Sequence, residues 1–390
     1  MTFRIKTLNA ISPLGLERFP SAGYEVGTEI DDPNALLLRS ANLHDVEIPA
    51  SVLAVARAGA GTNNIPIADY SAKGIPVFNT PGANANAVKE LTLAGILLAA
   101  RNIIDGASFA HRLDGDSDSM NEAVEKGKKQ FVGFELPGRT LAVIGLGAIG
   151  VEVANSATAL GMKVMGYDPS VTVENAWKLS SLVERVTNVE QLFRRADIVT
   201  LHVPLIAETK GLVGAKQLAL MKPTAVLINF SRAPIVDEAA LVEALDAGKL
   251  RGYVCDFPSP ALNKRPKVVT LPHLGASTAE AEDNCAVMAV DELRNYLENG
   301  VIRNSVNFPN IDLPRNPQTA RLAIANSNVP NMVGQISALL AEAGLNIADL
   351  LNRSKGELAY TLVDVEGAIP SELLTEIQSI PGVLSARILS

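Results

Sequence analysis

Residues 140–150 read Thr140-Leu141-Ala142-Val143-Ile144-Gly145-Leu146-Gly147-Ala148-Ile149-Gly150, a short apolar run that leads into a G-x-G-x-x-G turn. Glycine suits such a turn because the chain bends tightly and its backbone must approach a pyrophosphate without an intervening side chain. A helix is expected to begin here, with its unpaired N–H groups and its positive dipole end facing the anion. The stretch predicts the strand, turn and helix of a dinucleotide-binding unit.

The residues that follow complete this unit. A helix-like segment over 151–160 is followed by Gly161 and by a second apolar strand that ends at Asp168. An acid in this position can accept hydrogen bonds from a ribose 2′-hydroxyl and repels a 2′-phosphate. Each part alone also occurs as ordinary turn chemistry, but here all the parts come in register. We therefore predict an NAD site and disfavour NADP.

Composition narrows the class of protein. The chain has 390 residues, 47% hydrophobic and 19% charged, with a net charge of −8. It is long enough for two or three domains, and it has no basic tract interleaved with aromatic residues, so we expect no nucleic-acid partner. Two cysteines, Cys255 and Cys285, indicate no disulfide framework and fit a reducing cytoplasm. Residues 1–7 lack a signal core, and the longest apolar run, 91–100, is too short to span a bilayer.

Strands and helices are predicted to alternate along most of the chain. Apolar runs near 196–204, 225–232 and 252–256 each end in polar or turn residues, which is typical of a doubly wound parallel sheet. The first hundred residues form a smaller α/β unit of their own, with a buried helix over 89–101. Its expected strands are 3–8, 35–39, 53–57 and 76–79.

Small residues gather at two strand ends of this first unit, in Arg57-Ala58-Gly59-Ala60-Gly61 and in Asn79-Thr80-Pro81-Gly82. They leave backbone N–H groups free to form an anion nest, and Arg57 adds a positive charge. Two ordinary glycine-rich turns and a surface arginine explain the same pattern equally well. After a polar loop over 114–119, the basic run that contains Lys128 is either a solvated face or the border of a site.

Two further motifs follow strands of the large sheet. One is Asn229-Phe230-Ser231-Arg232-Ala233-Pro234, and the other is Pro272-His273-Leu274-Gly275-Ala276-Ser277-Thr278. With the glycine turn, Asp168 and Asn79-Thr80-Pro81-Gly82, they resemble the motifs of the D-isomer-specific 2-hydroxyacid dehydrogenases. The resemblance covers essentially the whole chain. The form of the histidine motif points to the branch that oxidises D-3-phosphoglycerate to 3-phosphohydroxypyruvate, the first step of the phosphorylated route to L-serine.

The resemblance implies an α/β protein of three parts. These are a discontinuous flavodoxin-like substrate domain (1–98 and 284–312), a Rossmann NAD-binding domain (99–283) and a C-terminal ferredoxin-like ACT regulatory domain (318–390). In this family the active site lies in the cleft between the first two domains, and closure of the cleft excludes water. The last seventy residues fit a βαββαβ order, with strands at 321–325, 346–353, 357–365 and 383–389 and helices at 332–343 and 371–378.

Oxidation of a secondary alcohol requires a base and a hydride acceptor. His273 is the natural base because imidazole titrates near neutral pH. Arg232 offers a planar fork that can hold the substrate carboxylate and polarise the C2 oxygen. The resemblance implies cofactor contacts from Gly145, Gly147, Ala148, Ile149, Gly150, Asp168, His202, Val203, Pro204, Asn229, Phe230, Ser231, Asp256, His273 and Gly275. It implies substrate contacts from Arg57, Ala58, Gly59, Asn79, Gly82, Lys128 and Arg232, with Arg57 on the phosphate, and it implies no metal.

One departure from the family concerns the partner of His273. The family usually places a glutamate between the arginine and histidine motifs, where it pairs with the histidine. Residues 257–279 contain no carboxylate, and Asp256 matches an aspartate that lies near the nicotinamide instead. The partner of His273 is then water, a backbone carbonyl or a carboxylate from elsewhere in the chain.

The ACT resemblance implies an effector site for L-serine at an interface between two copies, and hence a homo-oligomer, a dimer or a tetramer. Asn326, Asn328 and Asn346 fall where the family places its serine ligands, and Pro330-Asn331 stands where Pro-Gly is usual, so the backbone of this loop is expected to differ. The alternative is that the asparagines only mark turns and the domain only oligomerises.

Two other functions stay open from the sequence. One is a related dehydrogenase that acts on hydroxypyruvate, glyoxylate or 2-ketoglutarate. The other is a non-enzymatic NAD-sensing protein, which the missing glutamate favours and the intact Arg232 and His273 disfavour.

Overall fold

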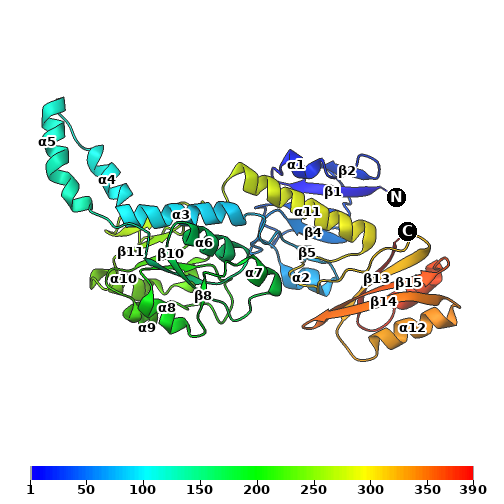
Figure 1. The fold of residues 1–390 in the computed structure, drawn as a ribbon. Coiled ribbons are helices and arrows are strands. Elements are labelled where there is room, and N and C mark those ends of the chain that lie inside the picture. The colour runs from blue at the N-terminus through cyan, green and yellow to red at the C-terminus, as the bar shows by residue number, and fades with distance from the viewer. Residues whose placement is uncertain (1, 390) are drawn as a thin grey trace. The chain divides into compact units, whose positions relative to one another are not determined.

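The computed structural model describes residues 2–389, and the chain divides into two compact units. One unit combines Met1–Asn84 with Ala279–Ser390, and the other is Ala85–Thr278. The first unit contains two sheets and the second contains one (Figure 1). No helix among residues 2–389 is both long and apolar enough to cross a bilayer.

The N-terminal sheet of the first unit is entirely parallel, with the order β2-β1-β3-β4-β5, the flavodoxin-like arrangement. Its strands are β1 (Phe3–Leu8), β2 (Tyr24–Gly27), β3 (Ala35–Leu38), β4 (Ala54–Arg57) and β5 (Val77–Phe78), with helices α1 (Pro13–Leu16) and α2 (Ile67–Ala72). The long helix α11 (Ala279–Asn299) returns to lie along this sheet (Figure 1). It buries Ala286, Val290, Leu293 and Leu297, which recur at helical spacing.

The second unit is built on seven parallel strands in the order β12-β11-β10-β9-β6-β7-β8, the Rossmann order with one added strand. They are β6 (Thr140–Ile144), β7 (Lys163–Tyr167), β8 (Glu184–Arg185), β9 (Ile198–Leu201), β10 (Val226–Asn229), β11 (Gly252–Cys255) and β12 (Val268–Thr270). Every residue of β9, β10 and β11 is buried, as expected when helices cover both faces of a sheet.

Helices pack on both faces of this sheet. The core of one face includes α3 (Ala85–Arg101) and α6 (Ala148–Ala159). The core of the other includes α8 (Val189–Arg195), α9 (Ala215–Leu220) and α10 (Glu238–Asp246). The unit also contains the α-helices α7 (Val173–Lys178), α4 (Ile103–Ala110) and α5 (Ser117–Gly127). Helices α4 and α5 project from the body of the unit, and neither has a buried residue (Figure 1).

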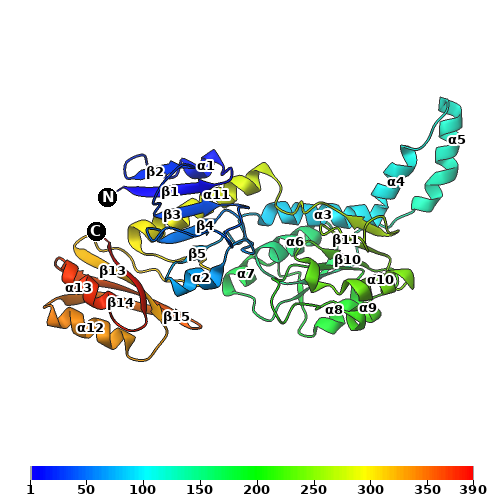
Figure 2. The ribbon, with the colours of Figure 1, turned by 180° about the vertical axis from the view of Figure 1, so that it is seen from behind.

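The C-terminal sheet of the first unit is antiparallel, with the order β14-β15-β13-β16. Its elements are β13 (Thr319–Ser327), α12 (Met332–Glu342), β14 (Asn346–Lys355), β15 (Leu358–Glu366), α13 (Ser371–Gln378) and β16 (Val383–Leu389). Both helices cover one face, where Ile336 and Ile377 are fully buried (Figure 2). Ala323 and Tyr360 on the other face join the core formed with α11.

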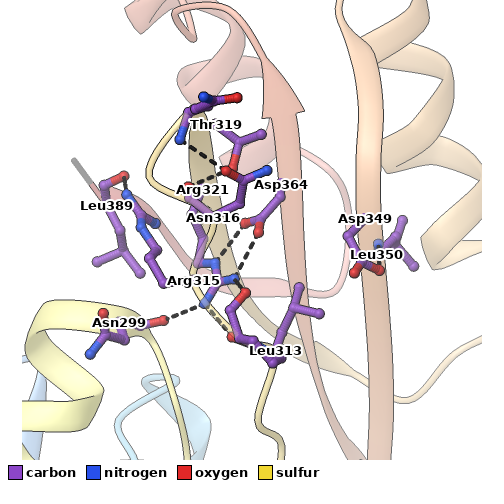
Figure 3. Close-up of polar contacts among 12 residues, drawn as sticks. Asn299, Leu313, Arg315, Asn316, Thr319, Arg321, Asp349, Leu350, Asp364 and Leu389 are labelled. Atoms are coloured by element: carbon purple, nitrogen blue, oxygen red, sulfur yellow. Dashed lines mark hydrogen bonds and ion pairs between the residues drawn. The ribbon is translucent and has the colours of Figure 1, made fainter.

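One fully buried ion pair ties the C-terminal sheet to its surroundings. The guanidinium of Arg321 on β13 binds the carboxylate of Asp364 on β15 through Nε–Oδ1 at 2.6 Å and Nη2–Oδ2 at 2.7 Å. It also donates to the carbonyls of Asn299 at 3.1 Å, Leu313 at 2.8 Å and Pro314 at 3.0 Å (Figure 3). A single side chain thus joins the end of α11, the segment before β13 and two strands.

The three sheets confirm the fold class expected from the sequence, including the βαββαβ order of the C-terminal part. The units divide at 84/85 and 278/279, whereas the expected boundaries at 98/99 and 283/284 fall inside α3 and α11. The polar segment 114–119 is not all loop, because Asp116 caps α5 by accepting a hydrogen bond from the Ser119 N–H at 2.9 Å.

Candidate active site and cofactor site

The glycine turn after β6 has the geometry that a dinucleotide requires. Gly145 has a φ of +94°, and a Cβ on it would lie 2.6 Å from the His202 carbonyl oxygen. A Cβ on Gly150 would lie 1.9 Å from the Gly145 carbonyl oxygen, so the helix can pack closely only with glycine there. A Cβ on Gly147, in contrast, would meet no atom within 4 Å. Open space over Gly147, just before Ala148 and Ile149 start α6, fits a pyrophosphate at a helix N-terminus.

Asp168 follows β7 directly, and the backbone orients its carboxylate. Oδ2 accepts the Leu146 N–H at 2.8 Å, and Oδ1 accepts the Ser170 N–H at 2.8 Å. A carboxylate oxygen has more than one lone pair, so both oxygens can still accept a hydroxyl proton. The carboxylate is thus fixed beside the glycine turn, as the second-strand acid of an NAD site should be.

Asp168→Asn is expected to lower kcat/KM for NAD about 10- to 100-fold, because the ribose loses a hydrogen bond to a charged acceptor. The same substitution is expected to raise kcat/KM for NADP. Loss of the negative charge removes the repulsion of a 2′-phosphate. The measurement is steady-state kinetics with both cofactors, and Glu174→Gln on exposed α7 is the matched control. An unchanged ratio of the two kcat/KM values would show that Asp168 does not select the cofactor.

His202, just after β9, is half-buried and is held by two contacts. Its N–H donates to the Ile144 carbonyl at 2.7 Å, and its Nε2 lies 2.9 Å from Thr200 Oγ1. Burial lowers the pKa of His202 to about 4, so the ring is neutral at neutral pH. His202 and Val203 lie against Gly145. This position suits a lining residue, as predicted for His202, Val203 and Pro204, and not a proton acceptor at neutral pH.

The turn after β10 presents Arg232. Asn229 is fully buried, and its side chain donates to the Arg232 carbonyl at 2.9 Å and accepts the Ser231 N–H at 3.1 Å. Ser231 Oγ donates to the Leu201 carbonyl at 2.5 Å, which ties the turn to β9. The Arg232 side chain is exposed, and its Nη1 donates a hydrogen bond to the Ser231 carbonyl at 2.6 Å. The side chain of Phe230 is buried against α3, so only its backbone is available for the predicted cofactor contact.

Asp256, after β11, is the carboxyl group whose charge interacts with both Arg232 and His273. It is 1% exposed; Oδ2 accepts the Gly275 N–H at 3.2 Å, and Oδ1 has no partner within residues 2–389. Burial raises the pKa of Asp256, and the positive charges of His273 and Arg232 act in the opposite direction. Buried acceptors almost always have a donor, so the unpaired Oδ1 is suited to accept a hydrogen bond from an amide such as that of nicotinamide.

His273 is attached to Asp256 through its backbone. Its N–H donates to the Asp256 carbonyl at 3.0 Å, and its φ of +51° turns the exposed ring outward from the strand end. The ring stands edge-on to Phe257 with centroids 5.3 Å apart. In the described part of the chain the ring makes no hydrogen bond to a carboxylate. His273 thus lacks the hydrogen-bonded glutamate whose absence the sequence indicated. Contact with Phe257 is a feature that no motif indicated.

The two glycine-rich loops lie at the ends of β4 and β5, but several N–H groups of the expected anion nest are already used there. Those of Ala58, Gly59 and Thr80 donate to the carbonyls of Leu38, Arg57 and Gly59. Arg57 folds back over the loop, donating from Nε to the Arg39 carbonyl at 2.8 Å and from Nη1 to the Gly61 carbonyl. A Cβ on Gly59 would lie 3.2 Å from Arg57 Nη1, so this glycine makes room for the guanidinium. Asn79 Nδ2 joins the two loops by donating to the Ala60 carbonyl at 2.6 Å. The remaining predicted contacts, Ala58 (buried) and Gly82 (φ +84°), lie in the same two loops.

Lys128 lies apart from the strand ends of its unit, in the short 3₁₀ turn Lys128–Phe131 that follows α5. It is exposed and pairs with Glu125 at 2.5 Å. Its substrate contact therefore stays a prediction.

The three predicted effector residues lie at two ends of the C-terminal sheet. Asn326 is 1% exposed with an unpartnered Oδ1, and Asn328 donates to the Gly356 carbonyl at 3.0 Å. Asn346 pairs in register with Glu366, at the end where β13 begins, whereas Asn326 lies where β13 ends. One chain does not gather the three around a single ligand. Asn331 has a φ of +64°, in the left-handed region that glycine favours and asparagine tolerates, and the expected difference in the loop's backbone stays a prediction.

Comparison with known proteins decides the family. Residues 95–275 match the model of the D-isomer specific 2-hydroxyacid dehydrogenase NAD binding domain. The D-3-phosphoglycerate dehydrogenase of Haemophilus influenzae is 34% identical, with 99% of this chain and 94% of that relative covered. This chain belongs to the D-isomer-specific 2-hydroxyacid dehydrogenase family. The Escherichia coli D-3-phosphoglycerate dehydrogenase is also 34% identical, over 84% of this chain and 79% of that relative.

A solved relative in this family supports the cofactor. The NAD⁺-bound 3-phosphoglycerate dehydrogenase of Entamoeba histolytica is 26% identical, with a TM-score of 0.61, and the match covers 79% of this chain and 99% of that chain. NAD is thus the cofactor of the domain that carries Gly145, Gly147 and Asp168, in agreement with the sequence prediction. The open space over Gly147 and the orphaned Asp256 Oδ1 fit this group.

Proposed function

We propose that this protein oxidises D-3-phosphoglycerate to 3-phosphohydroxypyruvate with NAD, the first step of the phosphorylated route to L-serine. The observation that carries the proposal is the gathering of Arg232, His273 and buried Asp256 at the strand ends of an NAD-binding domain. The similarity to D-3-phosphoglycerate dehydrogenases over 99% of the chain supports this substrate. Such a reaction belongs in the cytoplasm, a location that stays a prediction.

The proposed mechanism assigns one task to each side chain. When bound, NAD supplies the acceptor for the hydride that leaves C2. The His273 imidazole takes the proton of the C2 hydroxyl as the C2–O bond becomes a carbonyl. The exposed guanidinium of Arg232 holds the substrate carboxylate and polarises the C2 oxygen. The charge of Asp256 then stabilises the imidazolium that forms, in place of the missing glutamate.

Arg57 is the proposed contact for the substrate phosphate. We expect Arg57→Ala to raise KM for D-3-phosphoglycerate about 10- to 100-fold with little change in kcat, because one charged hydrogen bond is lost. The phosphate-free analogue D-glycerate is the internal control, and its kcat/KM should not change. Equal losses for both compounds would assign Arg57 a structural role in holding its loop through Arg39 and Gly61, and an unchanged KM would remove it from the site.

We also propose that L-serine binds between the C-terminal sheets of two copies and slows the reaction. Asn326 and Asn346 lie at opposite ends of one sheet, so a shared ligand needs residues from both copies. Asn346→Ala should weaken serine binding in calorimetry about 10-fold and leave the rate without serine unchanged. Should wild-type protein show no heat of binding, or a rate indifferent to saturating serine, the sheet serves assembly alone. Analytical ultracentrifugation measures the oligomeric state, which we propose to be a dimer or a tetramer.

A further inference from the structure

Helix α11 places an acidic residue, Glu292, on its buried face. Cys285, Ala289 and Tyr296 recur at helical spacing around it and belong to the core of the first unit. Glu292 is 6% exposed, and the mechanism proposed above does not use it. Burial of a carboxyl group costs free energy unless the group is hydrogen-bonded, so its presence among apolar positions needs an explanation.

The Glu292 carboxyl group makes a hydrogen bond outside its own helix. Its Oε1 accepts from Asn304 Nδ2 at 2.7 Å, and its Oε2 is buried without a hydrogen-bond partner in the described chain. Burial raises the pKa of Glu292 to about 8, and the charge of Asp291 acts in the same direction. The group is therefore mostly a neutral acid at pH 7, and its carbonyl oxygen can still accept the bond from Asn304.

Asn304 lies in a turn beside β5, the edge strand of the N-terminal sheet. Its φ is +56°, and its N–H donates to Asn310 Oδ1 at 3.0 Å. The segment after this turn runs antiparallel to β5, where Ser305 forms a bridge with Phe78. The bond from Asn304 to Glu292 thus anchors a turn that flanks the end of β5.

The same turn supports residues 79–84, the substrate loop that follows β5. The Asn79 N–H donates to the Asn304 carbonyl at 3.4 Å, and Asn79 Nδ2 donates to the Ala60 carbonyl at 2.6 Å. The first of these bonds is long and hence weak, so it depends on a turn that is fixed from elsewhere. Asn79 is a predicted substrate contact. Hydrogen bonds through Asn304 therefore join the buried carboxyl group of Glu292 to the substrate loop.

We propose that Glu292 is a positioning residue for the oxidation: it holds the turn at Asn304 and thereby keeps Asn79 in place for the substrate. The inference rests on the proposed function, because it assumes that Asn79 contacts the substrate. Glu292 takes no part in the chemistry itself. Its loss therefore weakens substrate binding more than it slows the chemical step.

Two substitutions at residue 292 separate the hydrogen bond from the burial of the side chain. In Glu292→Gln the amide offers Asn304 the same acceptor as the neutral acid, whereas Glu292→Leu offers none. At pH 7 we expect Glu292→Leu to raise KM for D-3-phosphoglycerate about fivefold, the effect of about one hydrogen bond. Its kcat and its KM for NAD should stay within about twofold of the wild type. Glu292→Gln should keep all three values.

Two further variants of the full-length protein test the route through Asn304. Asn304→Gly allows the positive φ and removes the donor, so it should raise KM as Glu292→Leu does. The double variant should raise KM no further, because both substitutions break the same bond. Tyr24→Phe is the matched control, since it removes a hydrogen bond of 2.7 Å from β2 to Glu298 on the same helix. The KM of this control should match the wild-type value.

Hydrogen–deuterium exchange measures the support of the substrate loop without catalysis. Exchange over residues 78–84 should be faster in Glu292→Leu and Asn304→Gly than in the wild type, and unchanged in Glu292→Gln. A wild type that does not oxidise D-3-phosphoglycerate would reject the proposed function, and exchange would then decide whether Glu292 holds the loop. With an active wild type, an unchanged KM in Glu292→Leu would overturn the proposal. So would unchanged exchange, equal losses in Glu292→Gln, or an equal rise of KM in Tyr24→Phe.

Discussion

His273→Asn is expected to lower kcat for D-3-phosphoglycerate about 10²- to 10⁴-fold, the usual contribution of a positioned general base. Asparagine is the appropriate replacement because residue 273 has a φ of +51°, which asparagine adopts more readily than most residues. The backbone bond to the Asp256 carbonyl is then kept, and only the imidazole is lost. KM for NAD should stay within about threefold, since the contacts predicted from the glycine turn and from Asp168 are retained. Steady-state formation of NADH gives both values.

His202→Asn is the matched control, because burial lowers the pKa of His202 to about 4, so its imidazole is a much weaker base than an ordinary histidine. The kcat of His202→Asn should stay within about tenfold of the wild-type value, because a residue that only lines the site takes no proton in the reaction. A His273 variant with nearly full kcat would mean that another group takes the proton.

Arg321→Met is expected to lower the free energy of unfolding by about 3–5 kcal/mol, because Asp364 is left as a buried charge without its partner. The carbonyls of Leu313 and Pro314 also lose their donors. Chemical denaturation followed by circular dichroism measures the loss. The affinity for NAD, which belongs to the other unit, should not change.

Two comparisons isolate the buried pair. Arg303→Met breaks an exposed pair with Asp312 and should cost at most about 1 kcal/mol. Arg321→Met combined with Asp364→Leu should recover much of the loss, since no buried charge is then left alone. Equal and small losses in Arg321→Met and Arg303→Met would show that burial adds nothing to the pair.

Local chemistry explains why much of the fold could be predicted from the sequence. The turn at Gly145 requires a positive φ, and the strands of the large sheet are continuous apolar runs because both faces are covered. The strands and helices that were missed lack such signals. Glu184–Arg185 is a two-residue edge strand with both residues exposed, and Ile103–Ala110 has no buried residue. Their structure depends on neighbours that a local pattern does not contain.

The sequence predicts those residues of the site that belong to recognisable motifs. Arg232 and His273 were found from their motifs, but the unpaired Oδ1 of Asp256 follows from tertiary packing around the strand end. The burial of the Phe230 side chain against α3 also depends on packing. The placement of Asn326 and Asn346 at opposite sheet ends is set by strand register, which the sequence does not reveal.

The most direct test of the central claim is the initial rate of NADH formation by the purified full-length protein at pH 8. D-3-phosphoglycerate is compared with D-glycerate, glycolate and D-2-hydroxyglutarate, and hydroxypyruvate and glyoxylate are tested in the reverse direction. We predict that kcat/KM for D-3-phosphoglycerate exceeds that for D-glycerate about 100-fold or more, as expected when a charged contact to phosphate is lost. A preference for a phosphate-free compound would make the protein a different dehydrogenase of the same family. No NADH or NAD⁺ formation from any of the six compounds would contradict the assignment of an enzyme.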